Sequence, residues 1–191
     1  SRGYRMFEVR EYTSEVRSQV EDFRQATFAE GNEALAESKF DPDNLNGKTF
    51  YVTGGNEIAA LGVIEQDHYA TKDAKVFRAC RFHALKQYRN QALGTRFILP
   101  AMIDWATDRD YDCVYWTHDV KQRALNAIYQ KKRTPAGYTH LQDDPFWSRL
   151  KHDERWLFQV DPKSEMLQHV YYIDLNETNY KMNPIDCVIW K

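Results

Sequence analysis

The turn at residues 85–95 has the composition of a backbone site for phosphate groups. Residues 76–85 ahead of it are rich in β-branched, aromatic and small side chains, which is typical of a strand. Residues 97–106 behind it have the apolar spacing of a helix. The turn is therefore predicted at a helix start, where the first N–H groups have no intrahelical partner and lie at the positive end of the helix dipole. Gly94 and Ala92 keep side-chain bulk away from those groups, so a pyrophosphate could approach them.

Polar side chains near the end of the predicted strand are candidates for proton transfer. Arg78, Arg81 and His83 interrupt an otherwise apolar run, so part of the strand is expected to border a wet cleft. His83 titrates near neutral pH and is a candidate general base for an ammonium substrate, with a hydrogen-bonded structural histidine as the alternative. Further candidates are a chain of water molecules or the polar residues Glu65, Asp67 and His68.

The elements after the turn continue an alternating pattern. Residues 111–117 are apolar and aromatic over the length of a strand, and residues 120–132 have a helical pattern with an apolar face. The predicted order is therefore strand, phosphate turn, helix, strand, helix.

The turn and this order of elements resemble the GNAT superfamily of N-acetyltransferases, whose acetyl-CoA loop has the signature Arg/Gln-x-x-Gly-x-Gly/Ala. Arg89 matches the first position and Gly94 the last. Ala92 stands where the family usually has its first glycine, which an alanine tolerates at negative φ but not at positive φ. In the second helix, Tyr129 occupies the place of the family's tyrosine. Gln122 stands where the family often has asparagine, and the nearest asparagine is Asn126.

The resemblance implies acetyl-CoA as co-substrate and a set of residues that hold it. Those residues are Ala84, Leu85, Arg89, Asn90, Gln91, Ala92, Leu93, Gly94, Thr95, Gln122 and Asn126. The pantetheine arm would add to the strand edge near residues 82–85, as an extended peptide does. The resemblance also makes Tyr129 the general acid, because a phenol with a pKa of about 10 can protonate a thiolate whose pKa is about 8.5. Without the resemblance, a core tyrosine would be the simpler interpretation.

The rest of the chain is compatible with the same fold. A first strand is predicted at residues 4–10, and helical patterns at 15–36 that break near Gly31. Strands at 49–53 and 58–64 are joined by the hairpin-type turn Gly54-Gly55-Asn56, and a closing strand pair is predicted at 156–160 and 166–175. The expected architecture is an α/β GNAT fold, with a mixed, mostly antiparallel sheet of six to seven strands and about four helices. It forms a single domain over residues 1–191, with a loop insertion at 134–150 and a C-terminal extension after residue 175.

The composition of the chain argues against several kinds of binding partner. With 42% hydrophobic and 14% aromatic residues, the 191-residue chain can bury a substantial core. Its 26 basic and 28 acidic residues give no field that would attract nucleic acid. No apolar run reaches the length of a membrane span. Three cysteines at wide spacing argue against a metal knuckle and against a disulfide framework, so a cytoplasmic protein without a metal is expected.

Three functions remain open at this point. The leading interpretation is an N-acetyltransferase that transfers an acetyl group from acetyl-CoA to a primary amine of a small molecule or peptide. The second is a non-catalytic GNAT-fold protein that binds CoA or acyl-CoA, and the third is an unrelated α/β protein-interaction module. The identity of the amine and the formation of a homodimer are left open by the residues.

Overall fold

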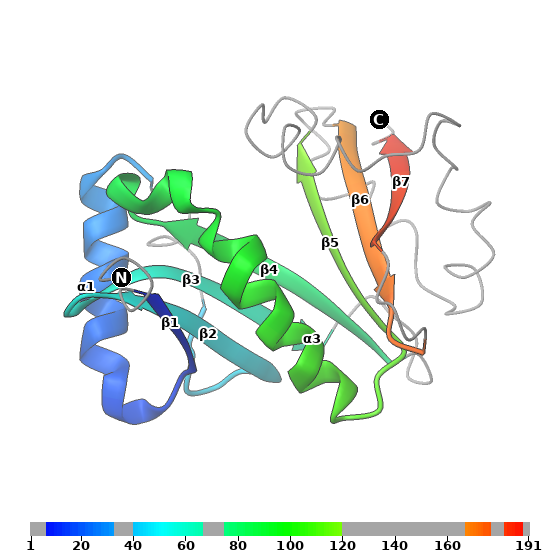
Figure 1. Ribbon diagram of the computed structural model, residues 1–191, viewed down its shortest axis with the longest axis horizontal. Helices are drawn as coiled ribbons and strands as arrows, with labels where there is room; N and C mark the ends of the chain where they lie inside the picture. Colours follow the sequence, from blue (N-terminus) through cyan, green and yellow to red (C-terminus); the bar gives the residue numbers. More distant parts are fainter. Residues whose placement is uncertain (1–6, 33–39, 67–74, 120–166, 177–181, 189–191) are drawn as a thin grey trace. The chain divides into compact units, whose positions relative to one another are not determined.

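The computed structural model describes residues 7–32, 40–66, 75–119, 167–176 and 182–188 (Figure 1). Its contacts divide the chain into two units, Ser1–Gln66 with Ala79–Asp108, and Asp67–Arg78 with Arg109–Lys191. Strand β4 (Val76–Ala84) contributes residues to both units. None of the described helices is long and apolar enough to cross a membrane.

The first unit is built on an antiparallel β-hairpin. Strand β2 (Gly47–Gly54) pairs with β3 (Glu57–Gln66), and β1 (Phe7–Glu11) pairs antiparallel with β2. Gly55, at the hairpin turn, has a φ of 65°, a conformation that glycine adopts without steric cost. The predicted hairpin is confirmed, with strands that reach beyond the predicted bounds to Gly54 and Glu57.

Helix α1 (Arg17–Ala29) follows a short 3₁₀ segment, η2 (Ser14–Val16), and buries one face. Val20 and Phe23 of this helix join a core cluster with Leu61 and Val63 of β3. The helix ends at Ala29 with Glu30 as its C-cap, and Gly31 has a φ of 88°, as is common for glycine after a helix. The predicted break near Gly31 is therefore confirmed, while residues 33–36 lie outside the described residues.

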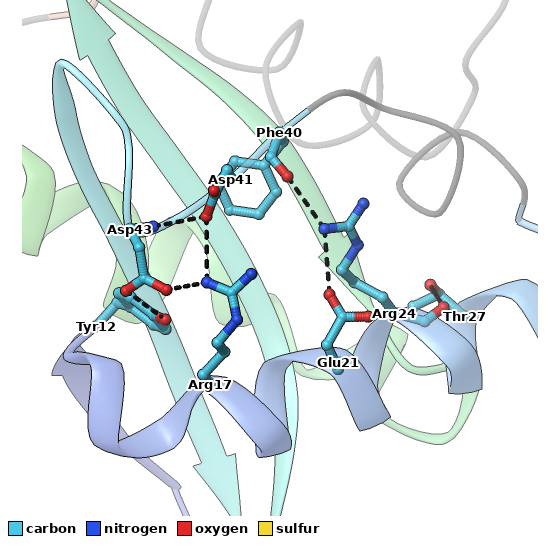
Figure 2. A network of polar contacts seen from close by, with 8 residues as sticks. All are labelled: Tyr12, Arg17, Glu21, Arg24, Thr27, Phe40, Asp41 and Asp43. Atoms are coloured by element: carbon cyan, nitrogen blue, oxygen red, sulfur yellow. Dashed lines mark hydrogen bonds and ion pairs between the residues drawn. The ribbon is translucent and has the colours of Figure 1, made fainter.

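A polar network holds residues 40–43 against helix α1 (Figure 2). The Tyr12 hydroxyl donates to Asp43 Oδ1 at 2.9 Å, and Arg17 pairs with the carboxylates of both Asp43 and Asp41. The Asp43 N–H also donates to Asp41, which holds the pKa of the Asp41 carboxyl below its ordinary value. Because the Arg17 pairs are exposed, they fix the path of this segment more than they stabilise the fold.

The chain from β4 to helix α3 changes helical type twice. The 3₁₀ segment η3 (Lys86–Gln91) follows β4, and a π-helical turn, η4 (Gly94–Ile98), leads directly into α3 (Leu99–Thr107). Helix α3 buries Leu99, Met102, Trp105 and Ala106. The helix predicted at 97–106 is confirmed, and the turn before it does open a helical run.

A glycine in β3 allows that helical run to lie close to the sheet. A Cβ atom at Gly62 would be 2.8 Å from Ile98 Cγ2 and 3.0 Å from Met102 Cε. Contacts this short are not tolerated without displacing one of the side chains. Gly62 therefore sets the depth at which η4 and α3 pack.

The second unit contains three further strands. The first residues of β4, Val76–Arg78, pair parallel with β5 (Cys113–Asp119). Strand β6 (Leu167–Asp174) pairs antiparallel with β5 and with β7 (Met182–Val188). Tyr115 and Tyr171 are fully buried, and the rings of Trp116 and Tyr171 stack with centroids 5.9 Å apart.

The strand order in the sheet is β1-β2-β3-β4-β5-β6-β7. Neighbours β1–β2, β2–β3, β5–β6 and β6–β7 are antiparallel, whereas β4–β5 is parallel. The predicted fold class, an α/β fold with a mixed and mostly antiparallel sheet, is confirmed.

The closing strands differ from the prediction. Residues 166–175 were expected to pair with 156–160, but β6 lies between β5 and β7. The C-terminal extension predicted after residue 175 contains a strand that was not predicted, β7, and Pro184 within it is typical of a loop. Proline is tolerated there because β7 is the last strand of the described sheet, where a missing N–H breaks no inner ladder. Residues 156–160 and the predicted insertion at 134–150 lie outside the described residues.

Candidate functional site

The predicted phosphate turn begins where β4 ends. Leu85 is buried, and its N–H donates to the Ala59 carbonyl of β3 at 2.9 Å. Its carbonyl accepts from the Tyr88 N–H at 2.8 Å, which closes the first turn of η3. Arg89 Nε donates to the Ala84 carbonyl at 3.2 Å, so this side chain folds back over the strand end. Leu85 thus anchors the turn to the core.

Ala92 marks the start of the helical run. Its φ and ψ are 53° and 41°, in the left-handed region, whereas Leu93 is already helical at −63° and −32°. The Ala92 carbonyl accepts from the Arg96 N–H at 2.9 Å, the first backbone bond of the run. The amides of Leu93, Gly94 and Thr95 precede that bond, but Leu93 is buried, so Gly94 and Thr95 provide the groups that an anion would meet.

The positive φ of Ala92 gives a first testable prediction. A left-handed conformation costs an alanine about 1–2 kcal/mol, and glycine pays no such cost. Glycine loses about 0.4–1 kcal/mol through the greater freedom of the unfolded chain. Ala92→Gly is therefore expected to raise the free energy of unfolding by roughly 0.5–1 kcal/mol, measured by urea denaturation. Ala92→Val is the matched control and should be destabilised, and an Ala92→Gly protein less stable than the wild type would contradict the assigned conformation.

Gly94 is needed for space and not for a special dihedral angle. Its φ is not positive, but a Cβ atom at this position would lie 3.2 Å from Cδ1 of Phe82 in β4. The Phe82 side chain is exposed enough to border a ligand. The last position of the predicted loop motif therefore keeps a small residue next to an aromatic ring.

Arg81 forms an irregularity in β4. Its φ of 52° is unusual for a residue within a strand and breaks the alternation of side chains. Its Nη1 donates to Glu65 Oε1 at 2.8 Å and lies 3.3 Å from Cys80 Sγ. Burial alone would lower the pKa of Arg81, but these contacts raise it above the ordinary value.

This ion pair changes the interpretation of two polar residues. Glu65 was a candidate base, but its carboxylate is half-buried and already binds Arg81. The Arg81 guanidinium also lies 5.5 Å from the centre of the Phe40 ring, which Arg24 approaches at 5.6 Å. Arg81 therefore joins β3, β4 and residue 40. The other two candidates, Asp67 and His68, lie outside the described residues.

His83 is half-buried and engaged by a residue that the sequence did not single out. Asn32 Nδ2 lies 2.8 Å from His83 Nδ1. Burial, and then the charges of Arg89 and Arg81, lower the pKa of His83 below its ordinary value. The imidazole is therefore neutral at pH 7.

The end of helix α1 also holds the start of η3. Both carboxylate oxygens of Glu30 accept from the Lys86 N–H, at 3.1 and 3.0 Å, and Glu30 lies 3.8 Å from the Arg89 guanidinium. Sequence reasoning missed Glu30 and Asn32. The available signal was the helix stop at Gly31, which places two polar residues at one helix end.

A small pocket of about 100 Å³ lies in the first unit between helix α1 and the β2–β3 turn. Its lining includes Asp22 and Phe23 of the helix, Glu57 of β3 and Leu85. Glu57 already accepts hydrogen bonds from Gln87 at 2.7 Å and from Tyr88 at 2.9 Å. Three predicted residues, Gln122, Asn126 and Tyr129, lie outside the described residues, so their roles stay predictions.

No protein-family model matches the sequence, and no curated protein has a significant sequence match to it. The structure is similar to that of a protein from Lactobacillus plantarum assigned as an N-acetyltransferase, with 20% identity and a TM-score of 0.50 over 70% of this chain and 88% of that one. This chain has the GNAT fold. A GNAT acetyltransferase from Elizabethkingia anophelis, solved with acetyl-CoA bound, is 14% identical with a TM-score of 0.44 over 66% of this chain and 74% of that one. A Staphylococcus aureus acetyltransferase of the GNAT family is 13% identical with a TM-score of 0.48 over 65% of this chain and 82% of that one.

The GNAT fold confirms the resemblance at the level of architecture. It also fixes the place of the turn in that architecture, after β4 and before α3. At these identities the likeness carries the fold and leaves the residue roles to the local geometry.

Proposed function

We propose that this protein transfers an acetyl group from acetyl-CoA to a primary amine of a small molecule or peptide. The observation that carries the proposal is the helix start after β4. There Ala92, in the left-handed conformation, and the buried Leu93 are followed by the amides of Gly94 and Thr95, which precede the first backbone hydrogen bond of the helical run. This arrangement suits a pyrophosphate, because the amides and the helix dipole act together on an anion.

The proposed cofactor contacts follow from this geometry. The pyrophosphate would meet residues 89–95, and the pantetheine arm would run along the edge of β4 before Leu85, where Ala84 ends the strand. Gln122 and Asn126 are proposed as further contacts to that arm. The Arg89 guanidinium is half-exposed near the turn and adds a positive charge. Because the proposed contacts come mainly from the backbone, a loop with only one glycine is sufficient to hold the cofactor.

Acetyl transfer from a thioester requires few specific side chains. When bound, acetyl-CoA supplies a thioester that is already activated towards an amine. The protein has to orient the amine, donate a hydrogen bond to the developing oxyanion and protonate the departing thiolate. The irregular backbone at Arg81 and the side chain of His83 are proposed to border the reacting groups, and Tyr129 is proposed as the general acid.

One observation favours a second candidate, a GNAT-fold protein that binds CoA without turnover. Ala92 places a methyl group on a left-handed residue at the start of the phosphate turn, where glycine would leave more room. A weakened phosphate site would bind the cofactor without holding it well enough for catalysis.

Two measurements test the proposal in order. Acetyl-CoA at 100 times its dissociation constant is expected to stabilise the protein by about 2.7 kcal/mol, seen as a rise in melting temperature. Acetyl-pantetheine, which lacks the pyrophosphate, is the control and should stabilise it much less. Thiol release from acetyl-CoA is then measured against a panel of small amines and peptides. Stabilisation without release by any amine would favour the binding protein, and an absence of both would reject acetyl-CoA as ligand.

A further inference from the structure

The hydrogen bond between Asn32 and His83 connects two elements of the first unit. Asn32 follows the end of α1, where its N–H donates to the Thr27 carbonyl at 2.9 Å. His83 is the penultimate residue of β4. The 2.8 Å contact joins the amide Nδ2 of Asn32 to the ring Nδ1 of His83. The second contact of the same helix end, from Glu30 to the Lys86 N–H, keeps the two elements together.

The atoms that this contact joins indicate where the imidazole carries its proton. An amide nitrogen only donates, so Nδ1 must accept and cannot itself hold a hydrogen. A neutral imidazole has one N–H group, which therefore lies on Nε2. Within the described part of the chain, Nε2 has no hydrogen-bond partner and is not a buried polar atom. It is free to donate to a ligand.

The charges around the ring support the same state. Burial of the ring is the main factor that opposes protonation by lowering the pKa of His83, and the cations Arg89 of η3 and Arg81 of β4 oppose it further. The carboxylate of Glu30, at the same helix end as Asn32, lies 3.8 Å from the Arg89 guanidinium and accepts from the Lys86 amide. To accept a proton, His83 would have to lose the bond from Asn32 and carry a charge next to two guanidinium groups.

We propose that Asn32 is a positioning residue that holds His83 as a neutral imidazole with its proton on Nε2, so that His83 is a hydrogen-bond donor and not the general base. This inference rests on the proposed acetyltransferase function for what Nε2 donates to, which is an oxygen of the acyl group or of the acceptor. The proton of an ammonium acceptor then leaves through water. Asn32 sets the direction of His83 in the same way that an outer hydrogen bond sets the tautomer of a metal-bound histidine.

The tautomer is measured directly by ¹⁵N NMR of the imidazole nitrogens in the intact protein without ligand. The chain has six histidines, so the His83 signals are identified as those lost in His83→Gln. Wild-type His83 is expected to show an unprotonated Nδ1 and a protonated Nε2 at pH 7. In Asn32→Asp the carboxylate can only accept, so the proton is expected to move to Nδ1 and the pKa of His83 to rise. A protonated Nδ1 in the wild type, or an unchanged tautomer in Asn32→Asp, overturns the proposal.

The activities of two His83 variants distinguish a hydrogen-bond donor from a general base. The side-chain amide of glutamine can place an N–H near the position of Nε2 but cannot take up a proton at neutral pH. With the amine that gives the fastest thiol release, His83→Gln is expected to retain about tenfold more activity than His83→Ala. Equal loss in both variants overturns the donor role. Because the NMR result requires neither acetyl-CoA nor turnover, failure of the acetyltransferase proposal and failure of the tautomer assignment are distinguishable.

Discussion

Gly94→Val is expected to abolish the stabilisation of the protein by acetyl-CoA. A Cβ atom at residue 94 would lie 3.2 Å from Phe82 Cδ1, so the two branches of valine have to turn away from the ring, over the turn. There they would cover the amides of Gly94 and Thr95 that precede the first helical hydrogen bond. If the pyrophosphate cannot bind, Gly94→Val loses all of the stabilisation that acetyl-CoA gives the wild type. That stabilisation is about 2.7 kcal/mol when acetyl-CoA is present at 100 times the wild-type dissociation constant.

The measurement is a pair of melting curves, with and without acetyl-CoA, for each variant. Gly94→Ala is the graded control, since a single methyl group should reduce the shift without removing it. The melting temperature of Gly94→Val without ligand reports separately on whether the helical run still packs. Equal stabilisation of Gly94→Val and the wild type by acetyl-CoA would remove residues 92–95 from the cofactor site.

Tyr129→Phe is expected to lower kcat by about 100-fold, the low end of the effects of general acids, with little change in acetyl-CoA affinity. The substitution keeps the ring and removes only the hydroxyl that would protonate the thiolate. Tyr129 lies outside the described residues, so this expectation depends on the sequence resemblance. Steady-state kinetics with the best amine of the panel would measure it.

Tyr12→Phe is a matched control for this experiment, because it also removes one phenol hydroxyl. Tyr12 donates to Asp43 beside helix α1 and has no part in the proposed site, so its kcat should stay at the wild-type value. An unchanged kcat in Tyr129→Phe across the pH range would return that residue to a purely structural role.

The elements that depend on local sequence could be predicted from the residues alone. The β2–β3 hairpin follows from a glycine turn between two apolar runs, and β4 and α3 follow from their residue types and spacing. Strand β7 was missed because a proline within it is typical of a loop, and only its place beyond β6 makes the strand possible. The register of β6 was likewise set by its neighbours in the sheet.

In the candidate site, too, the local part could be predicted from the sequence and the long-range contacts could not. The phosphate turn is a continuous segment, so its residues could be found from one motif. The contacts that orient it are distant in sequence, since Asn32 is 51 residues from His83 and Glu30 is 56 residues from Lys86. Nothing in the local pattern of either residue indicates its partner. The sign of φ at Ala92, which decides whether its side chain is strained, also required the folded backbone.

The π-helical turn at Gly94–Ile98 has a consequence for how this segment can change in length. A π turn holds one residue more than an α-helical turn, and the Leu99 N–H closes it by donating to the Gly94 carbonyl. Each residue of an α-helix turns the chain by about 100°. Losing a residue from a regular α-helix would rotate the following face by that angle, but deleting one here converts the π turn into an α-helical turn, so the buried face of α3 keeps its phase. The π turn therefore makes this segment tolerant of a one-residue deletion that, elsewhere in the helical run, would turn Met102 away from Gly62 of the sheet.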